Sequence, residues 1–184
     1  MRVIAGAARG RALRGPRGAA TRPTSARVRA ALFSLLEARG AAFDRVLDLF
    51  AGTGALAIEA LSRGAQEAVF VEQSRAACMA IERNLVALGL RERARVICGA
   101  LPSALARVPT GPYTLIFIDP PYAARVEELF ARLGTSGMLA PATIVVYEHD
   151  RRVTPPMRCG VLALTLSRTY GDSTISLYQA LEGN

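Results

Sequence analysis

Short apolar runs alternate with segments of helical period through most of the chain. The apolar runs are residues 45–49, 68–71, 95–98, 113–118 and 143–147, and the helical segments are residues 55–63, 75–88, 103–106 and 124–133. Strands that alternate with helices form a parallel sheet with both faces covered, because each helix carries the chain back to the edge where the next strand starts. The sequence therefore predicts an α/β fold.

The last part of the chain departs from this alternation. Residues 161–169 and 174–180 are rich in branched and aromatic side chains, and they flank the turn residues Gly171-Asp172. This pattern predicts an antiparallel hairpin at the C-terminal end of an otherwise parallel sheet.

The 184 residues fit one domain that is large enough for a sheet with two covered faces. We divide it into a basic arm (1–22), an N-terminal helix (23–40) and a catalytic core (41–184). Within the arm, residues 2–5 and 11–13 are candidates for a short hairpin. The helix is expected because Pro23-Thr24-Ser25 precedes apolar residues that recur on one helical face.

No apolar stretch in the sequence approaches the length of about 20 residues that a membrane-spanning helix needs. Arginines at positions 2 and 9 interrupt the beginning of the chain before a secretory apolar segment could form. We therefore expect a cytoplasmic protein that is a monomer and has no membrane partner.

The three cysteines, Cys78, Cys98 and Cys159, are widely spaced and have no metal-ligand partners nearby in the sequence. This argues against a disulfide framework and against a zinc site, so we expect buried small apolar residues and no metal. His149 is the only histidine. We expect it in a loop, solvated or hydrogen-bonded, rather than in a catalytic role.

The basic side chains are all arginine and are unevenly placed. Eight of the 23 lie within residues 1–36, which contain no acid, and the other 15 are matched by the 15 acidic residues. A basic segment on a neutral body is typical of a surface that follows nucleic-acid phosphates, which arginine binds in bidentate fashion. A GC-rich coding bias would explain the choice of arginine over lysine, but not the absence of acids. We therefore predict that this segment contacts nucleic acid.

Asp119-Pro120-Pro121-Tyr122 follows the apolar run 113–118 directly. Prolines offer carbonyl acceptors without N–H donors, and the Asp119 carboxylate adds two acceptor oxygens. Tyr122 can stack on a flat heterocycle. The four residues could be only a turn with an aspartate cap, but they also suit a ring that carries an amino group.

A second motif lies between the apolar run 45–49 and the helical segment after it. Gly52 and Gly54 permit a tight turn and close ligand approach at the edge where open α/β sheets bind ligands. Glu72, about 20 residues further on, is placed where an acid holds ribose hydroxyls. These residues could also be turn and strand-end residues, and the spacing also fits a nicotinamide-dependent enzyme. The Asp119 motif favours an enzyme that modifies an amino group.

The two motifs together resemble those of class I S-adenosylmethionine-dependent methyltransferases, in the branch that methylates amino groups. Over essentially its full length the chain is similar to the bacterial 16S ribosomal RNA guanine-N2 methyltransferase family. The matching stretches are Met1-Arg2-Val3-Ile4-Ala5-Gly6, Arg9-Gly10-Arg11, Arg22-Pro23-Thr24, Arg27-Val28-Arg29, Leu32-Phe33, residues 48–65, Asp119-Pro120-Pro121-Tyr122 and Tyr170-Gly171-Asp172-Ser173. The resemblance implies a Rossmann-like domain with a seven-stranded sheet whose last strand is reversed.

The resemblance also implies a role for individual residues. The residues expected to contact S-adenosylmethionine are Asp48, Ala51, Gly52, Gly54 and Glu72, with Ala100 near its adenine. Asp119 and the Pro120 carbonyl would accept hydrogen bonds from the guanine amino group, with Tyr122 stacked on the base. The residues expected to bind RNA are Arg9, Arg11, Arg22 and Arg27. The product of the cofactor would be S-adenosylhomocysteine, and the partner would be 16S rRNA or an assembling 30S subunit.

Two departures from the family pattern concern the cofactor. Ala57 stands where the family often has glycine, and Gly99-Ala100 offers no side-chain acceptor for the adenine amine. Two alternative functions stay open. One is methylation of a DNA or RNA adenine or another amino group, although DNA enzymes of this kind usually carry a further sequence-reading domain. The other is a non-catalytic RNA-binding module, against which the intact Gly52, Gly54, Glu72 and Asp119 count.

Overall fold

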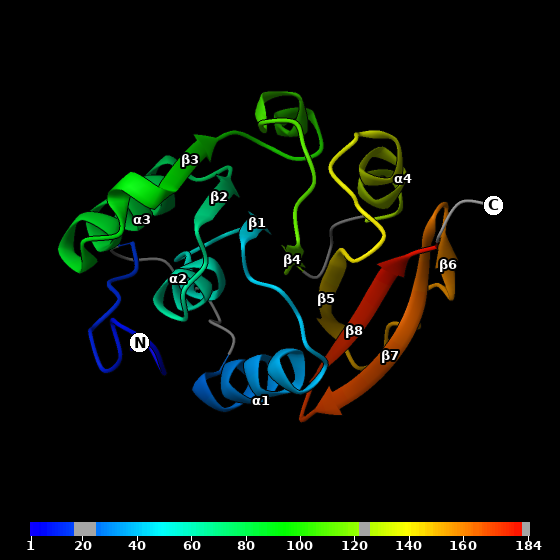
Figure 1. Cartoon of the computed structure of the whole chain (residues 1–184), viewed down its shortest axis with the longest axis horizontal. Coiled ribbons are helices and arrows are strands. Elements are labelled where there is room, and N and C mark those ends of the chain that lie inside the picture. Colours follow the sequence, from blue (N-terminus) through cyan, green and yellow to red (C-terminus); the bar gives the residue numbers. More distant parts are fainter. Residues whose placement is uncertain (17–24, 122–125, 182–184) are drawn as a thin grey trace.

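The computed structural model describes residues 1–16, 25–121 and 126–181. Its strands form one sheet with the order β3-β2-β1-β4-β5-β8-β7-β6 (Figure 1). The strands are β1 (Arg45–Leu49), β2 (Glu67–Glu72), β3 (Ala94–Cys98), β4 (Leu115–Ile118), β5 (Ile144–Asp150), β6 (Arg158–Cys159), β7 (Leu162–Tyr170) and β8 (Ser173–Ala180). Strands β1 to β5 pair in parallel, and β8 pairs antiparallel with both β5 and β7. The predicted parallel sheet and C-terminal hairpin are therefore confirmed.

The expected number of seven strands differs from the structure by one. The additional strand, β6, has only two residues and pairs with Ala163 and Leu162 at the start of β7. Two residues are too few to show an alternating pattern, so the sequence contained no signal for this strand.

Helices cover both faces of the sheet. The α-helices are α1 (Ala26–Ala38), α2 (Ala55–Ser62), α3 (Arg75–Leu88) and α4 (Glu127–Thr135), and the short 3-10 helices are η1 (Arg91–Arg93) and η2 (Ser103–Arg107). Residues of α1, α2 and α3 share one core, and residues of η2 and α4 share the other, in agreement with the two sides of the sheet in Figure 1. Among the helices described, none is long and apolar enough to cross a membrane.

The predicted N-terminal helix is found as α1, which begins at Ala26, and residues 23 and 24 of the predicted segment lie outside the described part of the chain. The Ser25 hydroxyl accepts a hydrogen bond from the Val28 N–H and caps α1. The predicted helix at 124–133 is found as α4, and residues 122–125 before it lie outside the described part of the chain.

The central strands are buried on both faces, and their side chains alternate between the two cores. Val46 and Phe117 belong to the core beneath α1 to α3, whereas Leu47 and Ile118 belong to the core beneath η2 and α4. Because successive side chains of a strand point to opposite faces, this alternation also sets the side on which polar residues at the strand ends lie.

Residues 1–16 of the basic segment pack against the rest of the domain. Arg2 and Ala12 form an isolated antiparallel bridge, which confirms the short hairpin. Val3, Ala8 and Leu13 are buried in the same core as α2. The hairpin within residues 1–16 therefore supplies the outer layer over this helix.

Glu59 on α2 holds this hairpin in place. Its two carboxylate oxygens accept hydrogen bonds from the N–H groups of Ile4 at 2.7 Å and Ala5 at 2.9 Å. Three residues further along the same helix, the Ser62 hydroxyl accepts from the Ala8 N–H and its carbonyl accepts from the Ala7 N–H.

Arg29 belongs to the acid-free segment but is only 1% exposed. One of its guanidinium nitrogens, Nη2, donates to the Arg2 carbonyl, and Nη1 lies 3.3 Å from the Met1 sulfur. Burial lowers the pKa of Arg29, and the Glu59 carboxylate opposes this shift. At least this arginine therefore joins α1 to the hairpin instead of facing a nucleic acid.

Gly6 and Gly10 allow a direct test of the packing between the hairpin and α2. Both have positive φ, 78° and 79°, but a Cβ on Gly6 would lie 1.8 Å from the Ser62 carbonyl oxygen, whereas a Cβ on Gly10 would meet nothing within 4 Å. Gly10→Ala should reduce the free energy of unfolding by about 1–2 kcal/mol through backbone strain alone. Gly6→Ala should cost about 1–3 kcal/mol more because the hairpin must move. Urea unfolding of both variants measures the difference, and equal losses would contradict the packing described.

Candidate functional site

A cavity of about 740 Å³ lies at the carboxyl ends of the parallel strands. Its wall is formed by the segments that follow β1, β2, β3 and β4, by the end of β5 and the start of β8, and by the beginning of α1. The size falls within the range of about 300–1,000 Å³ that is usual for small-molecule and cofactor sites.

The turn between β1 and α2 depends on two glycines for different reasons. Gly54 has φ 75°, and a Cβ there would lie 3.1–3.3 Å from the side chains of Ile81, Phe70 and Ile58. Gly52 has φ 55° and lines the cavity, and a Cβ there would meet only the Phe50 carbonyl oxygen, at 3.9 Å. Gly54 is thus required for packing, and Gly52 leaves open space over the turn.

Phe50 is a residue of this turn that the sequence did not single out. Its φ of 64° is the only positive value among the described non-glycine residues. A bulky residue in the left-handed region is strained, and such strain is often found at functional sites. Phe50 lines the cavity together with Ala51, Gly52 and Thr53.

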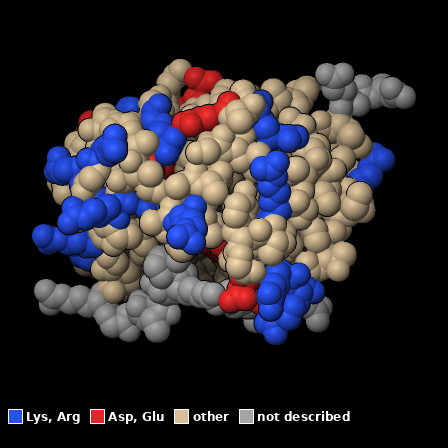
Figure 2. All heavy atoms as spheres, turned by 90° about the horizontal axis from the view of Figure 1, so that it is seen from below, with Lys and Arg blue, Asp and Glu red and all other residues tan. Residues whose placement is uncertain are grey.

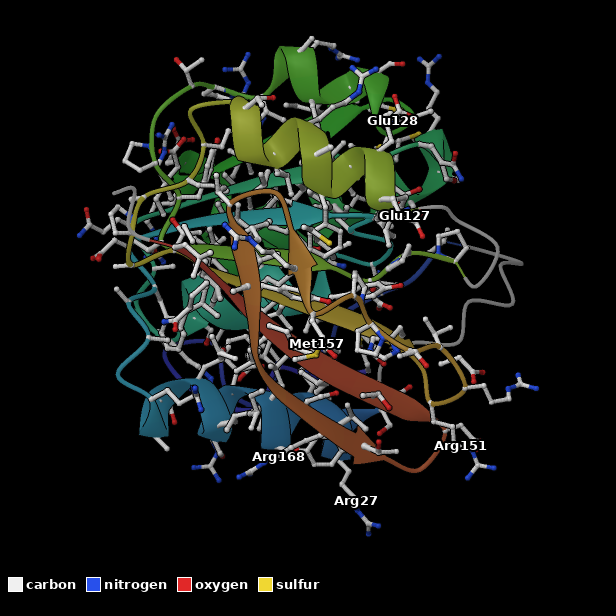
Figure 3. All side chains as sticks on the ribbon, turned by 90° about the vertical axis from the view of Figure 1, so that its right-hand side faces the viewer. Arg27, Glu127, Glu128, Arg151, Met157 and Arg168 are labelled. Carbon is white, nitrogen blue, oxygen red and sulfur yellow. The ribbon has the colours of Figure 1, made fainter. Side chains whose placement is uncertain are left out.

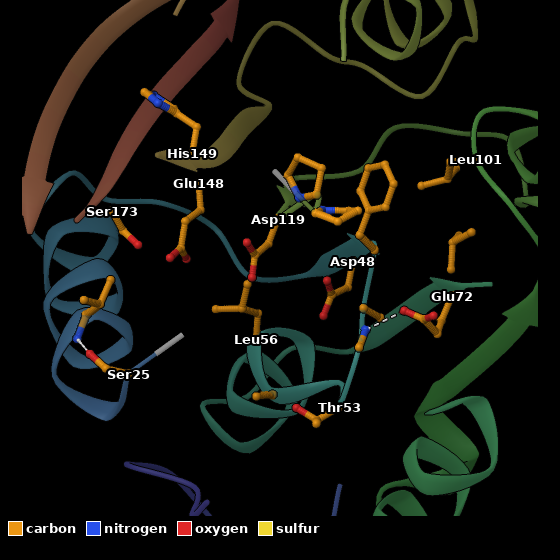
Figure 4. Close-up of a pocket in the computed structure, with 18 of the residues that line it drawn as sticks. Ser25, Asp48, Thr53, Leu56, Glu72, Leu101, Asp119, Glu148, His149 and Ser173 are labelled. Carbon is orange, nitrogen blue, oxygen red and sulfur yellow. Dashed lines mark hydrogen bonds between the residues drawn. The ribbon is translucent and has the colours of Figure 1, made fainter. Parts of the chain in front are cut away.

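Glu72 is oriented by the backbone on two sides. Its Oε2 accepts from the Gly52 N–H at 2.8 Å (Figure 4). Its Oε1 accepts from the Ser74 N–H at 2.7 Å. The glycine turn and the acid predicted to cooperate in cofactor binding are therefore linked by a hydrogen bond.

Asp48 is almost fully buried at the end of β1, where its Oδ2 accepts from the Ala57 N–H at 3.2 Å. Burial raises the pKa of Asp48 to about 8, with a smaller contribution from the carboxylates of Asp119 and Glu72 and against the effect of the hydrogen bond from Ala57. This end of the cavity therefore favours a proton or a positively charged ligand group.

Asp119 and Pro120 lie beyond the end of β4 and line the cavity, as does Pro121. Asp48 and Glu148 come from the neighbouring strands β1 and β5, and Figure 4 shows the three carboxyl groups directed into the same cavity. Asp119 therefore lines the same cavity as the glycine turn. Tyr122 lies outside the described residues.

Ala100 is exposed, while its neighbours Gly99 and Leu101 line the cavity. The Ala100 carbonyl accepts a hydrogen bond from the Ala104 N–H. Leu101 therefore provides an apolar surface at this end of the cavity that the sequence had not indicated.

Arg27, among the arginines predicted to bind RNA, is exposed near the cavity. It lies on the first turn of α1 between Ser25 and Val28, which both line the cavity. Arg22 lies outside the described residues.

Arg9 and Arg11 lie at the other end of the molecule. The turn that carries Arg9 packs against Ser62, the last residue of α2, and Arg11 Nη2 donates to the Ala87 carbonyl near the end of α3. Both helices run away from the strand ends that form the cavity, so these two arginines do not flank it. Figure 2 shows arginines spread over the face seen there rather than gathered into one patch.

His149 lies in β5, not in the expected loop. It is 6% exposed, and its ring nitrogens lie 2.9 Å from the Asp150 carbonyl oxygen and 2.9 Å from Ser176 Oγ. The predicted hydrogen bonding of this histidine is therefore confirmed and its loop location is wrong.

The cysteines differ from one another. Cys78 is buried and Cys159 is partly buried, but Cys98 is exposed, so the expectation of burial is wrong for that residue. Within residues 1–16, 25–121 and 126–181, no three His, Cys, Asp or Glu side chains form a group that could hold a metal ion.

The raised pKa of Asp48 predicts how stability changes with pH. The unfolded group has a pKa of about 3.9. Between this value and about 8, the folded chain retains a proton that the unfolded chain has released, so the free energy of unfolding falls as pH rises. Asp48→Asn should remove this part of the fall, which amounts to at most about 1.4 kcal/mol per pH unit. Parallel unfolding profiles of the wild type and the variant from pH 5 to 8 would contradict the protonated state of Asp48.

The comparisons with known proteins agree with this geometry. The family model described as "Conserved hypothetical protein 95" matches residues 1–179. The chain is 38% identical to "Putative rRNA methyltransferase YlbH" of Bacillus subtilis, over 97% of this chain and 98% of that protein. It is 36% identical to "Ribosomal RNA small subunit methyltransferase D" of Escherichia coli, over 97% of this chain and 89% of that protein.

The solved structure of "Putative methyltransferase yhhF from Escherichia coli" superposes with a TM-score of 0.86 at 35% identity and covers 98% of both chains. Fold and sequence likeness thus extend over nearly the whole chain. The chain therefore belongs to the conserved hypothetical protein 95 family, which includes ribosomal RNA small subunit methyltransferase D, among the class I S-adenosylmethionine-dependent methyltransferases.

Proposed function

We propose that this protein transfers a methyl group from S-adenosylmethionine to the exocyclic N2 amine of a guanine in 16S rRNA. The observation that carries the proposal is the shared cavity wall in which the glycine turn and Glu72 meet Asp119 and Pro120. The names of the relatives support an rRNA substrate. An assembling 30S subunit as the partner and a monomeric state remain predictions.

The cavity residues suit the proposed cofactor. The open space over Gly52 admits a ligand close to the backbone, and Glu72 presents a carboxylate beside it for ribose hydroxyls. Asp48 lies nearer the methionine end in this arrangement, where a cationic group would favour its ionised form. When bound, S-adenosylmethionine supplies an activated methyl group on a sulfonium.

Asp119 and the Pro120 carbonyl have the chemistry to hold an amine. The lone pair of a guanine amino group is delocalised into the ring, and acceptors on its hydrogens draw the nitrogen toward a more pyramidal and nucleophilic form. Asp119 and Pro120 would hold the amine toward the methyl group that S-adenosylmethionine supplies, and the Asp119 carboxylate or water would take the proton that the nitrogen loses on methylation. In-line positioning of the two reactants can contribute about 7–11 kcal/mol.

The position of Asp119 within the cavity restricts which guanines can reach it. A guanine within a duplex cannot bring its amino group to Asp119, so the target must be unpaired or flipped out of its stack.

Three exposed arginines lie beside the residues of the cavity rim. Arg27 is on α1, Arg151 directly follows β5, and Arg168 is on β7. The backbone N–H of Arg151 donates a hydrogen bond to the Asp172 carbonyl. Figure 3 shows all three at the same end of the molecule. We propose that they bind RNA phosphates around the target base, in place of the predicted Arg9 and Arg11.

Asp119→Ala should separate catalysis from cofactor binding. Loss of the acceptor should reduce kcat on small-subunit RNA at least about 100-fold, because charge that develops in the transition state is no longer stabilised. The affinity for S-adenosylmethionine, measured by calorimetry, should change little. The exposed carboxylate Glu128 provides the control variant Glu128→Ala. Equal loss of turnover and cofactor binding would show that Asp119 has a structural role instead.

The RNA surface can be tested by charge reversal. Arg27→Glu and Arg168→Glu should weaken RNA binding and reduce the slope of log affinity against log salt by about one for each phosphate that is no longer bound. Arg9→Glu, at the opposite end of the molecule, should leave both quantities unchanged. Fluorescence anisotropy over a salt series provides the measurement. A larger effect at Arg9 than at Arg27 would place the RNA surface on the N-terminal segment instead.

A further inference from the structure

We propose that Glu148 is a specificity-determining residue that accepts a hydrogen bond from the N1–H of the target guanine. This inference rests on the proposed function and concerns the choice between guanine and adenine. The Asp119 motif alone cannot make that choice, because both bases carry an exocyclic amine that could bind its acceptors.

The strand register places Glu148 next to Asp119. Ile118 of β4 pairs with Tyr147 of β5, so the residues that follow them, Asp119 and Glu148, continue the same parallel alignment. Glu148 also lies on the same face of the sheet as Val146, which belongs to the core beneath α1 and α2. In Figure 4 its carboxyl group is directed into the cavity on the side of Asp119 away from Glu72.

The order of the strands separates the two ligands in the cavity. Strand β4 lies between β1, which leads into the glycine turn, and β5, which carries Glu148. Asp119 is therefore flanked by the glycine turn on one side and by Glu148 on the other. A base can bring its amino group to Asp119 from the side opposite the glycine turn. The ring atoms next to that amino group then lie toward Glu148.

The other polar groups around this part of the cavity are arranged differently. Ser173, at the start of β8, offers a hydroxyl that can donate or accept, and His149 already has both ring nitrogens engaged with Asp150 and Ser176. Glu148 is 9% exposed, so a base that covers it would exclude most of the remaining water. A hydroxyl can hydrogen-bond to a ring nitrogen with or without a proton, whereas an ionised carboxylate can only accept from a protonated one.

The edges of the two bases differ at the atom next to the amine. Guanine has an N1–H donor beside its N2 amine, whereas adenine has an N1 lone pair beside its N6 amine. A carboxylate accepts from the guanine N1–H and meets an acceptor in adenine. Sites built to bind a donor reject analogues that lack it, because the buried acceptor is left without its partner.

A substitution of the target base tests this contact. 2-Aminopurine retains the N2 amine but lacks both the N1–H donor and the O6 carbonyl of guanine, so the N1–H contact is assigned by how the Glu148 substitution changes the preference between the two bases. The test first maps the guanine that the wild type methylates and then places 2-aminopurine at that nucleotide in the RNA. The wild type should prefer guanine at least about 100-fold in kcat/KM.

Glu148→Gln should remove most of that preference. The glutamine keeps an oxygen that accepts from guanine, and it adds an NH2 group that donates to the N1 of 2-aminopurine. The preference should fall to within about tenfold, with the affinity for S-adenosylmethionine unchanged. The exposed Glu128→Gln is the matched control and should keep the wild-type ratio. If Glu148→Gln loses cofactor affinity, Glu148→Asp replaces it, because a shorter carboxylate should also reduce the ratio.

The role of Glu148 would be overturned if the kcat/KM values of the wild type on guanine and 2-aminopurine differed by less than about threefold. It would also be overturned if Glu148→Gln lowered kcat/KM equally on both bases. These outcomes differ from failure of the proposed function, in which the wild type would form no N2-methylguanine in any small-subunit RNA.

Discussion

Three neighbouring parallel strands carry a carboxyl group at or near the same end and on the same face of the sheet. Asp48, Asp119 and Glu148 come from β1, β4 and β5, and they share one cavity with Glu72. Burial of these carboxyl groups is unfavourable, because desolvation and, to a smaller extent, the neighbouring carboxylates of Asp119 and Glu72 raise the pKa of Asp48. Hydrogen-bond donors and positive charge are the ligand groups that relieve it. The sulfonium and the purine amine of the proposed reaction both meet that requirement.

The remaining architecture keeps this wall rigid. The hydrogen bond between Glu72 and Gly52 links β2 to the turn after β1, and Gly54 lets that turn pack against Phe70 and Ile81. On the outer side, Glu59 fastens the N-terminal hairpin over α2. All eight residues of α2 are consequently buried. Helix α2, which begins at the glycine turn, is thus enclosed by the sheet on one side and by the N-terminal hairpin on the other.

The regular part of the fold could be predicted because it depends on local periodicity. The strands of the parallel sheet, the C-terminal hairpin and the glycine turn all have signals that lie within a few residues of one another. Asp119 directly follows a predicted strand, and it lines the cavity because strand ends of a parallel sheet meet at one edge. Strand β6 was missed because two residues have no period.

Features that depend on tertiary contacts could not be predicted in this way. Arg29 counts toward the basic charge of the N-terminal segment, yet only the folded chain shows that it is buried against Arg2 and Met1. The positive φ of Phe50 has no signature in its residue type. Glu148 is one residue beyond the predicted run 143–147, and its position beside Asp119 follows from the pairing of β4 with β5.

The identity of the methylated nucleoside tests the account most directly. The wild-type protein would be incubated with labelled S-adenosylmethionine and with 30S particles or small-subunit RNA that lack the modification. The RNA would then be digested to nucleosides for chromatography and mass spectrometry. The account predicts that the label is recovered as N2-methylguanosine. Recovery as N6-methyladenosine, or no transfer of label to either substrate, would contradict it.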